Sequence, residues 1–447
     1  MTLSARIAAH LANLRIDAVP PSALLASRRI MLDTLAVAWA GSVAPGIPAL
    51  RRGIAAGDAR DATLWGTTSR ASVLDCAFLN SAAAGALDYD SLHLQAVVHS
   101  DIVLLPAMLA IAERERVEGR RFLAVLTAAT DLMCRLGMST RAHSGWFYTS
   151  MHGVFAAAAG CAMLLGLNES GIRDSLGIAL FQTGGTQQSM VEKSLTKRLM
   201  SAFAARGGLF SAQLAQSGVT APREAFEGQF GFYAMYERGD PAVVLAGLGE
   251  HYLGTGISIK RFPSCGCNHA VIAATLQLVD AHDLAPSDVI EVRAVISQYM
   301  NRLVGAPYAP GDNPQVAAQF SVQYSVASAV LHRRLGVAEI QPEAALDPAA
   351  IALARKVEVV VDDDRAGQLA PAEVEIRTAS RGWLKCRVSE LPGSPGSPLS
   401  DAERIDKIRE CMGLGEEALG RDRIDALVGR VDELENLKDM SMLFKDL

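Results

Sequence analysis

The stretch GTGISIKRFPSCGCNH, residues 254–269, marks a change in the pattern of the sequence, and this change decides the fold. Before it, Ala, Leu, Met, Glu and Arg dominate and apolar residues recur at intervals of three and four, as in amphipathic helices. After it, several short segments alternate in polarity or are rich in β-branched residues, as in strands. The sequence therefore predicts a helical domain and a second domain of mixed α+β type.

The helical part contains long apolar segments with recognisable ends. In SALLASRRIMLDTLAVAWAG, residues 22–41, we expect Ser22 to cap a helix and Gly41 to end it. Similar helices are predicted over residues 71–86, 104–116, 122–136, 153–165 and 202–217.

Four strands and a linker follow the change in pattern. Strands are predicted over residues 288–297, 356–364, 372–380 and 383–390, with a hairpin turn at Arg381. The Pro/Gly/Ser-rich run at 391–400 predicts a linker, after which the pattern returns to helix. We expect the last helices to pack on the first domain. The predicted fold is therefore mainly α: a helical domain of residues 1–255 and 396–447, with an inserted α+β lid of residues 256–395.

Composition excludes several classes of partner. Half of the 447 residues are hydrophobic, so the chain can bury a large core. A formal net charge of -6 gives no basic field for nucleic acid or anionic lipid. The longest apolar run, residues 153–167, is shorter than the roughly 20 residues needed to span a bilayer. Seven scattered cysteines are typical of reduced thiols, so we expect a cytoplasmic protein. From the charge and the apolar runs, we expect neither nucleic acid nor a membrane as a partner.

Polar residues gather in ALDYDSLHLQAVVHSD, residues 86–101. Asp88, Asp90, His93, His99 and Asp101 fall within fourteen residues, between two predicted helices. A single histidine in a helical protein is most often just hydrogen-bonded. Polar loop residues on a rigid scaffold, in contrast, are where functional sites concentrate.

Metal and nucleotide sites find little support. His93 and His99 are six residues apart, off one helical face, and CGCNH at 265–269 has no second thiol pair. The run GLGEHYLGTG, residues 247–256, has Tyr252 where a dinucleotide fingerprint needs its third glycine. We therefore expect neither a metal nor a cofactor.

Cations accompany an Ala-rich helix in SLTKRLMSAFAARGG, residues 194–208. Lys197, Arg198 and Arg206 lie there, and a lysine partly removed from water has a lowered pKa. These side chains could hold carboxylates. A solvated helix start is the alternative.

Taken together, six segments resemble the MmgE/PrpD family, which includes 2-methylcitrate dehydratases, cis-aconitate decarboxylases and an iminodisuccinate epimerase. They occur in the family's order and extend over nearly the whole chain. The segments are MLDTLAVAWAGS (31–42), ALDYDSLHLQAVVHSD (86–101), HGVFAAAAGCAMLLGL (152–167), TKRLMSAFAARGG (196–208), IKRFPSCGCNH (259–269) and AQFSVQYSVASAVL (318–331).

The resemblance implies a cofactor-free homodimer whose active site lies between a helical domain and a lid and binds a small polycarboxylate. Asp88 and His99 match the family's acidic and imidazole site residues, Lys197 its lysine, and His269 its histidine after the KRFP turn. These four residues, together with Tyr148 just before the HGVF segment, are the predicted catalytic residues. The predicted substrate-binding residues are Arg198, Arg206, Lys260, Arg261, Arg302, His93 and Gln319.

Two departures from the resemblance bear on the reaction. Dehydratase-like and decarboxylase-like members read Asp-Phe-Asp-Asp-Thr where this chain has Ser91 and Leu92 at the last two places, and they carry a histidine where it has Phe147. All the family's reactions develop negative charge on a carbon next to a carboxylate, so each needs a base and fixed positive charge.

Dehydration and decarboxylation also need a proton donor, and Phe147 removes one candidate. Epimerisation needs only two bases. The sequence therefore favours an epimerase of an iminodisuccinate-like substrate. A dehydratase or decarboxylase, both lyases, and a helical protein that binds a polyanion without turnover stay as alternatives.

Overall fold

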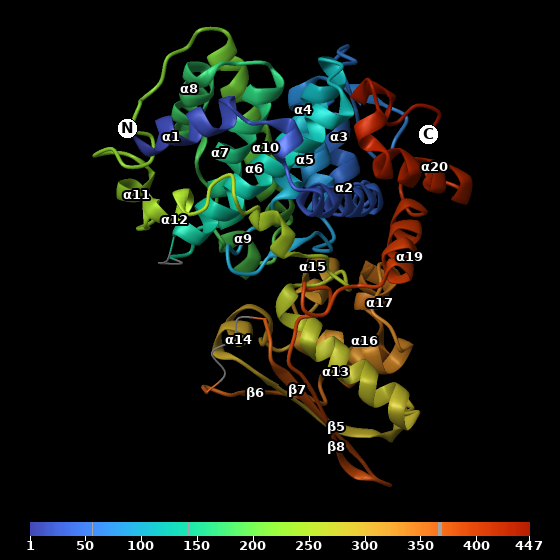
Figure 1. The fold of residues 1–447 in the computed structure, drawn as a ribbon. Helices are drawn as coiled ribbons and strands as arrows, with labels where there is room; N and C mark the ends of the chain where they lie inside the picture. Colours follow the sequence, from blue (N-terminus) through green and yellow to red (C-terminus); the bar gives the residue numbers. More distant parts are fainter. Residues whose placement is uncertain (56, 141–143, 365–368) are drawn as a thin grey trace.

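The computed structural model describes residues 1–55, 57–140, 144–364 and 369–447, and it contains two bodies (Figure 1). The larger, called the helical body, contains α1–α12 together with α19 and α20 from the C-terminal end. The smaller, called the α+β body, contains a four-stranded sheet and α13–α18. The prediction of a mainly α protein with a smaller α+β part is confirmed.

The helical body is built around α7, which is buried along its whole length. A helix that is apolar all round belongs in a core, and the Ala- and Gly-rich sequence of α7 lets its neighbours approach closely. The helices of this body are α1 (Leu3–Ala12), α2 (Pro21–Gly41), α3 (Ile47–Ile54), α4 (Val73–Ala84), α5 (Asp101–Arg114), α6 (Gly119–Ser139), α7 (Tyr148–Leu164), α8 (Glu169–Ala179), α9 (Gln188–Val191), α10 (Met200–Gln216), α11 (Phe232–Met235), α12 (Pro241–Leu245), α19 (Asp401–Met412) and α20 (Arg421–Asp432).

The two ends of α2 test the predicted helix signals separately. Gly41 ends the helix as expected, and a Cβ there would lie 2.0 Å from the carbonyl oxygen of Ala83 in α4, so only glycine fits. The predicted cap by Ser22 is wrong. Pro20 is the N-cap residue and makes no side-chain cap bond, while Pro21 takes the first helical position, where its missing N–H costs nothing.

The helix α6 is long and apolar enough to cross a membrane by length and composition, but nearly all of it is buried against the rest of the chain. A helix buried in the core of a folded protein can be as apolar as one that spans a membrane. Its hydrophobicity is explained by its interior position.

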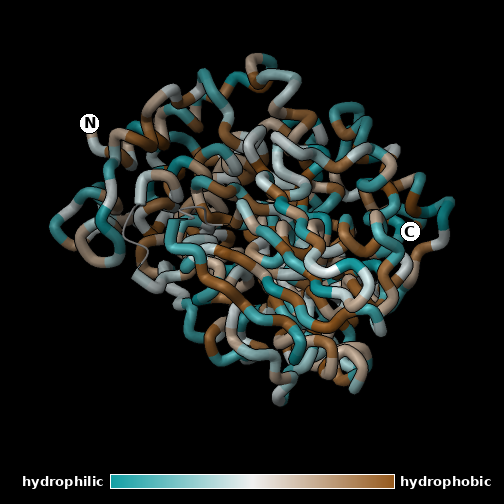
Figure 2. The backbone as a smooth tube through the Cα atoms, turned by 90° about the horizontal axis from the view of Figure 1, so that it is seen from below, coloured by the Kyte–Doolittle hydropathy of each residue, from teal (hydrophilic) through white to brown (hydrophobic). Residues whose placement is uncertain are grey.

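The sheet of the α+β body has the strand order β6-β5-β7-β8. Its strands are β5 (Val289–Ile296), β6 (Val357–Val361), β7 (Ala372–Thr378) and β8 (Gly382–Val388), all within the predicted segments or one residue outside them. Only β5 and β6 are parallel, and β7 and β8 form a hairpin that turns at Arg381, as predicted. Burial alternates along β7, and Figure 2 shows hydrophobic and hydrophilic residues alternating along the foreground segments. One face of the sheet therefore packs on helices.

The helices of the α+β body cover that face and extend towards the helical body (Figure 1). They are α13 (Gly266–His282), α14 (Gln298–Val304), α15 (Pro314–Gln319), α16 (Val322–His332), α17 (Pro342–Ala345) and α18 (Pro348–Ala354).

Two segments connect the bodies and lie side by side. The short strand β4 (Ile257–Ser258) leads out, and the predicted linker leads back. Ile259 donates its N–H to the carbonyl oxygen of Gly393 at 3.0 Å. A Cβ on Gly393 would lie 1.8 Å from the carbonyl oxygen of Ile259. The linker therefore packs against the segment that follows β4. The exact boundaries after residues 255 and 395 stay predictions.

After the linker, the chain returns to the helical body, where α19 packs on α2. The buried Lys407 of α19 lies 2.6 Å from the carboxylate of Asp33 in α2. Its ammonium also donates to the carbonyl oxygens of Tyr89 and Lys260, at 3.0 and 2.9 Å. Burial raises the pKa of Asp33, and the ammonium of Lys407 opposes that shift.

We expect Lys407→Ala to destabilise the protein, because it leaves the Asp33 carboxylate buried without its cation. Removing one partner of a buried ion pair costs roughly 3–5 kcal/mol. In a chain of this length, that corresponds to a fall in Tm of roughly 3–5 °C. The exposed Lys438 provides the control Lys438→Ala. Equal Tm values for the two variants would contradict this role of Lys407.

Candidate active site

A cavity of about 320 Å³ lies where the two bodies meet. Charged, polar and apolar side chains from both bodies line it. Those with polar groups are Asp88, Asp90, His99, Tyr148, Gln187, Lys197, Ser201, Lys260, Cys265, Cys267, Tyr299 and Arg302; the others are Gly85, Leu92, Leu94, Val97, Ile102, Phe147, Met190, Val191, Gly266, Leu303, Phe320 and Leu369.

The loop between α4 and α5, residues 85–100, forms one wall of this cavity. Its short strand β3 (Leu92–His93) pairs with β4, so the connection between the bodies fixes the loop in place. Asp88 adopts a left-handed backbone conformation, with φ 51°, which aspartate tolerates better than most residues. The loop thereby directs its carboxylates into the site.

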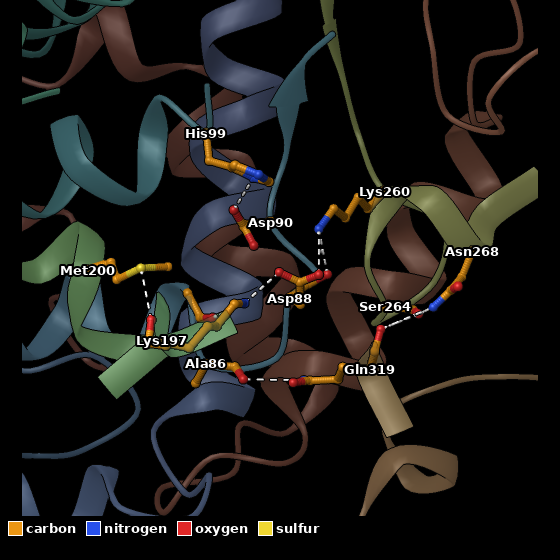
Figure 3. A network of polar contacts seen from close by, with 12 residues as sticks. Ala86, Asp88, Asp90, His99, Lys197, Met200, Lys260, Ser264, Asn268 and Gln319 are labelled. Carbon is orange, nitrogen blue, oxygen red and sulfur yellow. Dashed lines mark hydrogen bonds and ion pairs between the residues drawn. The ribbon is translucent and has the colours of Figure 1, made fainter. Parts of the chain in front are cut away.

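Asp88 lies between two lysines (Figure 3). Its carboxylate is 2.6 Å from the ammonium of Lys197 and 3.2 Å from that of Lys260, which also donates to the Asp88 carbonyl oxygen at 2.8 Å. Burial alone would raise the pKa of Asp88, but the two ammonium groups outweigh it and hold that pKa well below its usual range. Burial lowers the pKa of Lys260 less than the carboxylates of Asp88 and Asp90 raise it, so Lys260 stays charged.

Asp90 and His99 form a second pair in the cavity wall (Figure 3). Nδ1 of His99 lies 2.7 Å from a carboxylate oxygen of Asp90 and 3.0 Å from the carbonyl oxygen of Ser91. Both neighbours of Nδ1 are acceptors, so this nitrogen carries a proton, and Nε2 is the ring nitrogen left to exchange a proton with a ligand. Burial raises the pKa of Asp90, but His99 and Lys260 lower it further, so Asp90 stays ionised and can orient the ring.

Arg302 completes the charged set at the edge of the cavity. It is exposed on α14, with its guanidinium 5.7 Å from the ring centre of Tyr299. Among the described residues, no carboxylate pairs with it. The described lining therefore holds three cations, Lys197, Lys260 and Arg302, against the two carboxylates of Asp88 and Asp90, which leaves the site able to bind a ligand's carboxylate.

The structure does not bring His269 to the cavity wall. The ring is fully buried on α13, packs edge-on against Phe262, and donates from Nε2 to the carbonyl oxygen of Ser264 at 3.2 Å. Within the part of the chain that the structure describes, Nδ1 has no hydrogen-bond partner. Burial, and secondarily Lys260, lowers the pKa of His269 to about 3. Of the two predicted histidines, only His99 lines the cavity, while His269 lies behind the wall, where the charges of Lys260 and Asp88 still act on it.

Lys260, Tyr148 and Arg302 line the cavity as the sequence predicted, but five other predicted residues lie outside its lining. Arg198 is buried and contacts Gln315 at 2.5 Å, and burial lowers its pKa to about 10. Arg206 is exposed on α10, and Arg261 is exposed and pairs with Glu403 at 2.9 Å. His93 is buried in β3, and Gln319 donates to the carbonyl oxygen of Ala86 at 3.3 Å. Arg198 and Gln319 therefore tie neighbouring segments together behind the wall, whereas Arg206 and Arg261 lie on the surface.

Sequence reasoning missed several groups in the wall. Asp90 lies in the stretch that was singled out, so its position was a usable signal. Cys265 and Cys267 lie at the start of α13, and the Cys267 thiol donates to Cys265, which lowers the pKa of Cys265. Nothing in the local pattern places these thiols or Tyr299 at the cavity.

Val97 shows backbone strain within the wall. It has φ 54°, in the left-handed region that β-branched residues avoid, and it donates its N–H to the carbonyl oxygen of His93 at 2.9 Å. Such a conformation costs about 1–3 kcal/mol and persists only where the surroundings impose it.

Within the described ranges, no group of three His, Cys, Asp or Glu side chains is arranged to hold a metal ion. The functional groups of the cavity are therefore the cations and the Asp90–His99 pair.

We expect His269 to make stability depend on pH. An unfolded histidine binds a proton below a pH of about 6.5, whereas folded His269 does so only near its pKa of about 3. As pH falls from 6.5 towards 3, the unfolded state binds more protons, and the free energy of unfolding falls by about 1.4 kcal/mol per pH unit from this group.

Urea unfolding at pH 6.5, 5.5 and 4.5 measures that slope. His269→Asn should flatten it, and His332→Asn, at an exposed histidine, should not. Parallel curves for the parent and His269→Asn would contradict the neutral, buried state of this ring.

Comparison with known proteins extends over both bodies. The N-terminal domain of the MmgE/PrpD family matches residues 5–244, and its C-terminal domain matches residues 262–433. The chain is 26% identical to the "Cis-aconitate decarboxylase-like protein oryM" of Aspergillus oryzae over 99% of this chain and 96% of that protein.

Two further relatives carry the same activity in their names. The chain is 29% identical to a cis-aconitate decarboxylase of Aspergillus terreus over 70% of this chain and 69% of that protein. It is 24% identical to the human cis-aconitate decarboxylase over 96% of this chain and 91% of that protein. All three of these relatives are named as decarboxylases or decarboxylase-like proteins, and none is named as an epimerase. With both family domains matched in order along a two-body fold, the chain belongs to the MmgE/PrpD family.

Proposed function

We propose that this protein is a lyase that removes carbon dioxide from a small unsaturated polycarboxylate of the cis-aconitate class. The observation that carries the proposal is the Asp90–His99 pair beside a cluster of cations in one cavity. The names of relatives that align with nearly the whole chain support the same reaction.

In the proposed step, the bond between a terminal carboxylate and its CH₂ carbon breaks, and carbon dioxide leaves. The electron pair of that bond forms a new C=C bond. The pair of the former double bond moves onto the carbon that bears another carboxylate, which becomes enediolate-like. A proton then adds to that carbon, so a tricarboxylate and one proton give a dicarboxylate and carbon dioxide.

Lys197, Lys260 and Arg302 supply the positive charge that this step requires. A carboxylate that becomes enediolate-like gains negative charge, and cations fixed before the reaction stabilise it without rearranging. Because Asp88 holds both lysines, their ammonium groups are positioned before a substrate arrives.

His99 is the proton donor in this proposal. Nδ1 is engaged by Ser91 and Asp90, so the proton exchanged with the substrate is carried on Nε2. The ionised Asp90 orients the ring and provides a counter-charge while the ring holds two protons. The hydroxyl of Tyr148, at the start of α7, is a second candidate proton donor within the same lining.

Phe147 was the argument for an epimerase, and the structure weakens that argument. Its ring stacks near that of His99, with centroids 6.5 Å apart, so one imidazole stays in the cavity although another is absent at position 147. A proton donor is therefore available for lyase chemistry.

Incubation with cis-aconitate, 2-methylcitrate and iminodisuccinate in deuterium oxide, followed by NMR, tests the proposal. Decarboxylation releases carbon dioxide from cis-aconitate and leaves one deuterium on the protonated carbon. Exchange of an α-hydrogen of iminodisuccinate without loss of carbon dioxide or water would overturn the proposal in favour of an epimerase. Dehydration of 2-methylcitrate alone would overturn it in favour of a hydro-lyase.

We expect His99→Gln to lower kcat for carbon dioxide release by about 10²- to 10⁴-fold, as for loss of a general acid. Asp90→Asn should also lower kcat, because an amide nitrogen facing Nδ1 favours the wrong tautomer. Asp280→Asn, at an exposed aspartate of α13, is the matched control. If His99→Gln keeps more than a tenth of the parent kcat, His99 is not the donor.

A further inference from the structure

The cavity wall combines its charges with an apolar surface that a simple tricarboxylate does not need. Leu94 and Val97 come from the loop before α5, Phe147 from the start of α7, Met190 and Val191 from α9, and Leu303 from α14. These positions belong to both bodies, so the apolar surface forms only where the bodies meet.

Backbone pairing makes part of this surface continuous. Phe147 donates its N–H to Gly185 at 3.0 Å and Gln187 donates to Gly145 at 2.9 Å, so the segment before α7 lies against the segment that enters α9. Met190 of α9 and Leu303 of α14 both pack against the hydrophobic core of the α+β body. Phe147, α9 and α14 therefore form one side of the cavity.

Two positions in the wall are apolar here although the resemblance expects polar groups. Leu92 occupies a threonine position and Phe147 a histidine position, and both line the cavity. Both changes make the wall more apolar while the polar residues Asp88, His99 and Lys197 are kept.

Val97 supports the same conclusion independently. Its left-handed conformation suits glycine or asparagine, yet this position of the lining holds a valine, which also packs against the core of the helical body. A branched hydrocarbon at a strained position within a site points to a contact with a ligand.

We infer that the substrate is an alkyl-substituted polycarboxylate, in which a hydrocarbon chain lies against this apolar surface while the carboxylates contact the cations. The inference rests on the proposed function for the carboxylate part. Carboxylates are unfavourable next to hydrocarbon, whereas an alkyl chain gains free energy by leaving water. A cavity of about 320 Å³ has room for such a chain beside a compact tricarboxylate.

Calorimetric titration with tricarballylate and its methyl, propyl and pentyl derivatives tests the inference without requiring turnover, because these saturated compounds lack the double bond. We expect Kd to fall about 4-fold for each added methylene until the surface is covered, which is the ~0.8 kcal/mol of one buried methylene. An unchanged or rising Kd along the series would overturn the inference.

Val97→Asn gives the sharpest variant, because asparagine tolerates the left-handed conformation but is polar. The variant should keep or raise Tm while the ratio of Kd values for tricarballylate and its pentyl derivative falls at least 4-fold. Val219→Asn, at an exposed valine outside the cavity lining, should leave that ratio unchanged. An unchanged ratio in a folded Val97→Asn protein would remove Val97 from the proposed contact.

Failure of this inference and failure of the proposed function give different results. If chain length has no effect on Kd but cis-aconitate still loses carbon dioxide, the substrate class is wrong and the reaction stands. If Kd falls with chain length but no carbon dioxide is released from cis-aconitate or its alkyl derivatives, the binding inference stands and the reaction is wrong.

Discussion

The ion pairs of Asp88 with Lys197 and Lys260 are the interaction on which the site depends. Asp88 is 6% exposed, and an ionised carboxylate at that depth is stable only with compensating charge. Lys197 comes from the helical body and Lys260 from the segment that leads to the α+β body. The same carboxylate therefore fixes the docking of the two bodies and the geometry of the cations.

The surrounding contacts transmit that constraint. Lys407 of α19 donates to the carbonyl oxygens of Tyr89 and Lys260, so α19 holds both sides of the Asp88 cluster. The pairing of β3 with β4 places the loop, and with it His99. In this arrangement the proton donor and the cations are positioned by elements that are distant in sequence but share one small network of buried polar contacts.

Much of the fold was predictable because it rests on periodicity. The four strands followed from alternation and β-branched residues, and Gly41 ended α2 as a glycine should. The cap at Ser22 failed because the N-cap residue is Pro20, two residues earlier, and the helix begins at Pro21. The linker at 391–400 was recognised by composition, but its pairing with Ile259 was not, since no local signal encodes a contact across 134 residues.

The site was predictable only in part. Asp88, His99 and Lys197 could be predicted because they match site residues of the resembled family, and all three line the cavity. His269 does not, because residue type and order do not tell which side of α13 faces the cavity. The role of Asp90 depends on a distance of 2.7 Å that only three-dimensional structure provides. The homodimer and the cytoplasmic location stay predictions of the sequence.

The measurement that tests the central claim most directly is the rate of carbon dioxide release from cis-aconitate by Lys197→Met, compared with Lys385→Met on β8, where the lysine is exposed and pairs with Glu375. If Asp88 positions Lys197 for the developing negative charge, kcat/KM of Lys197→Met falls by about 10²-fold or more, and Lys385→Met matches the parent. Equal kcat/KM values for both variants would contradict the account.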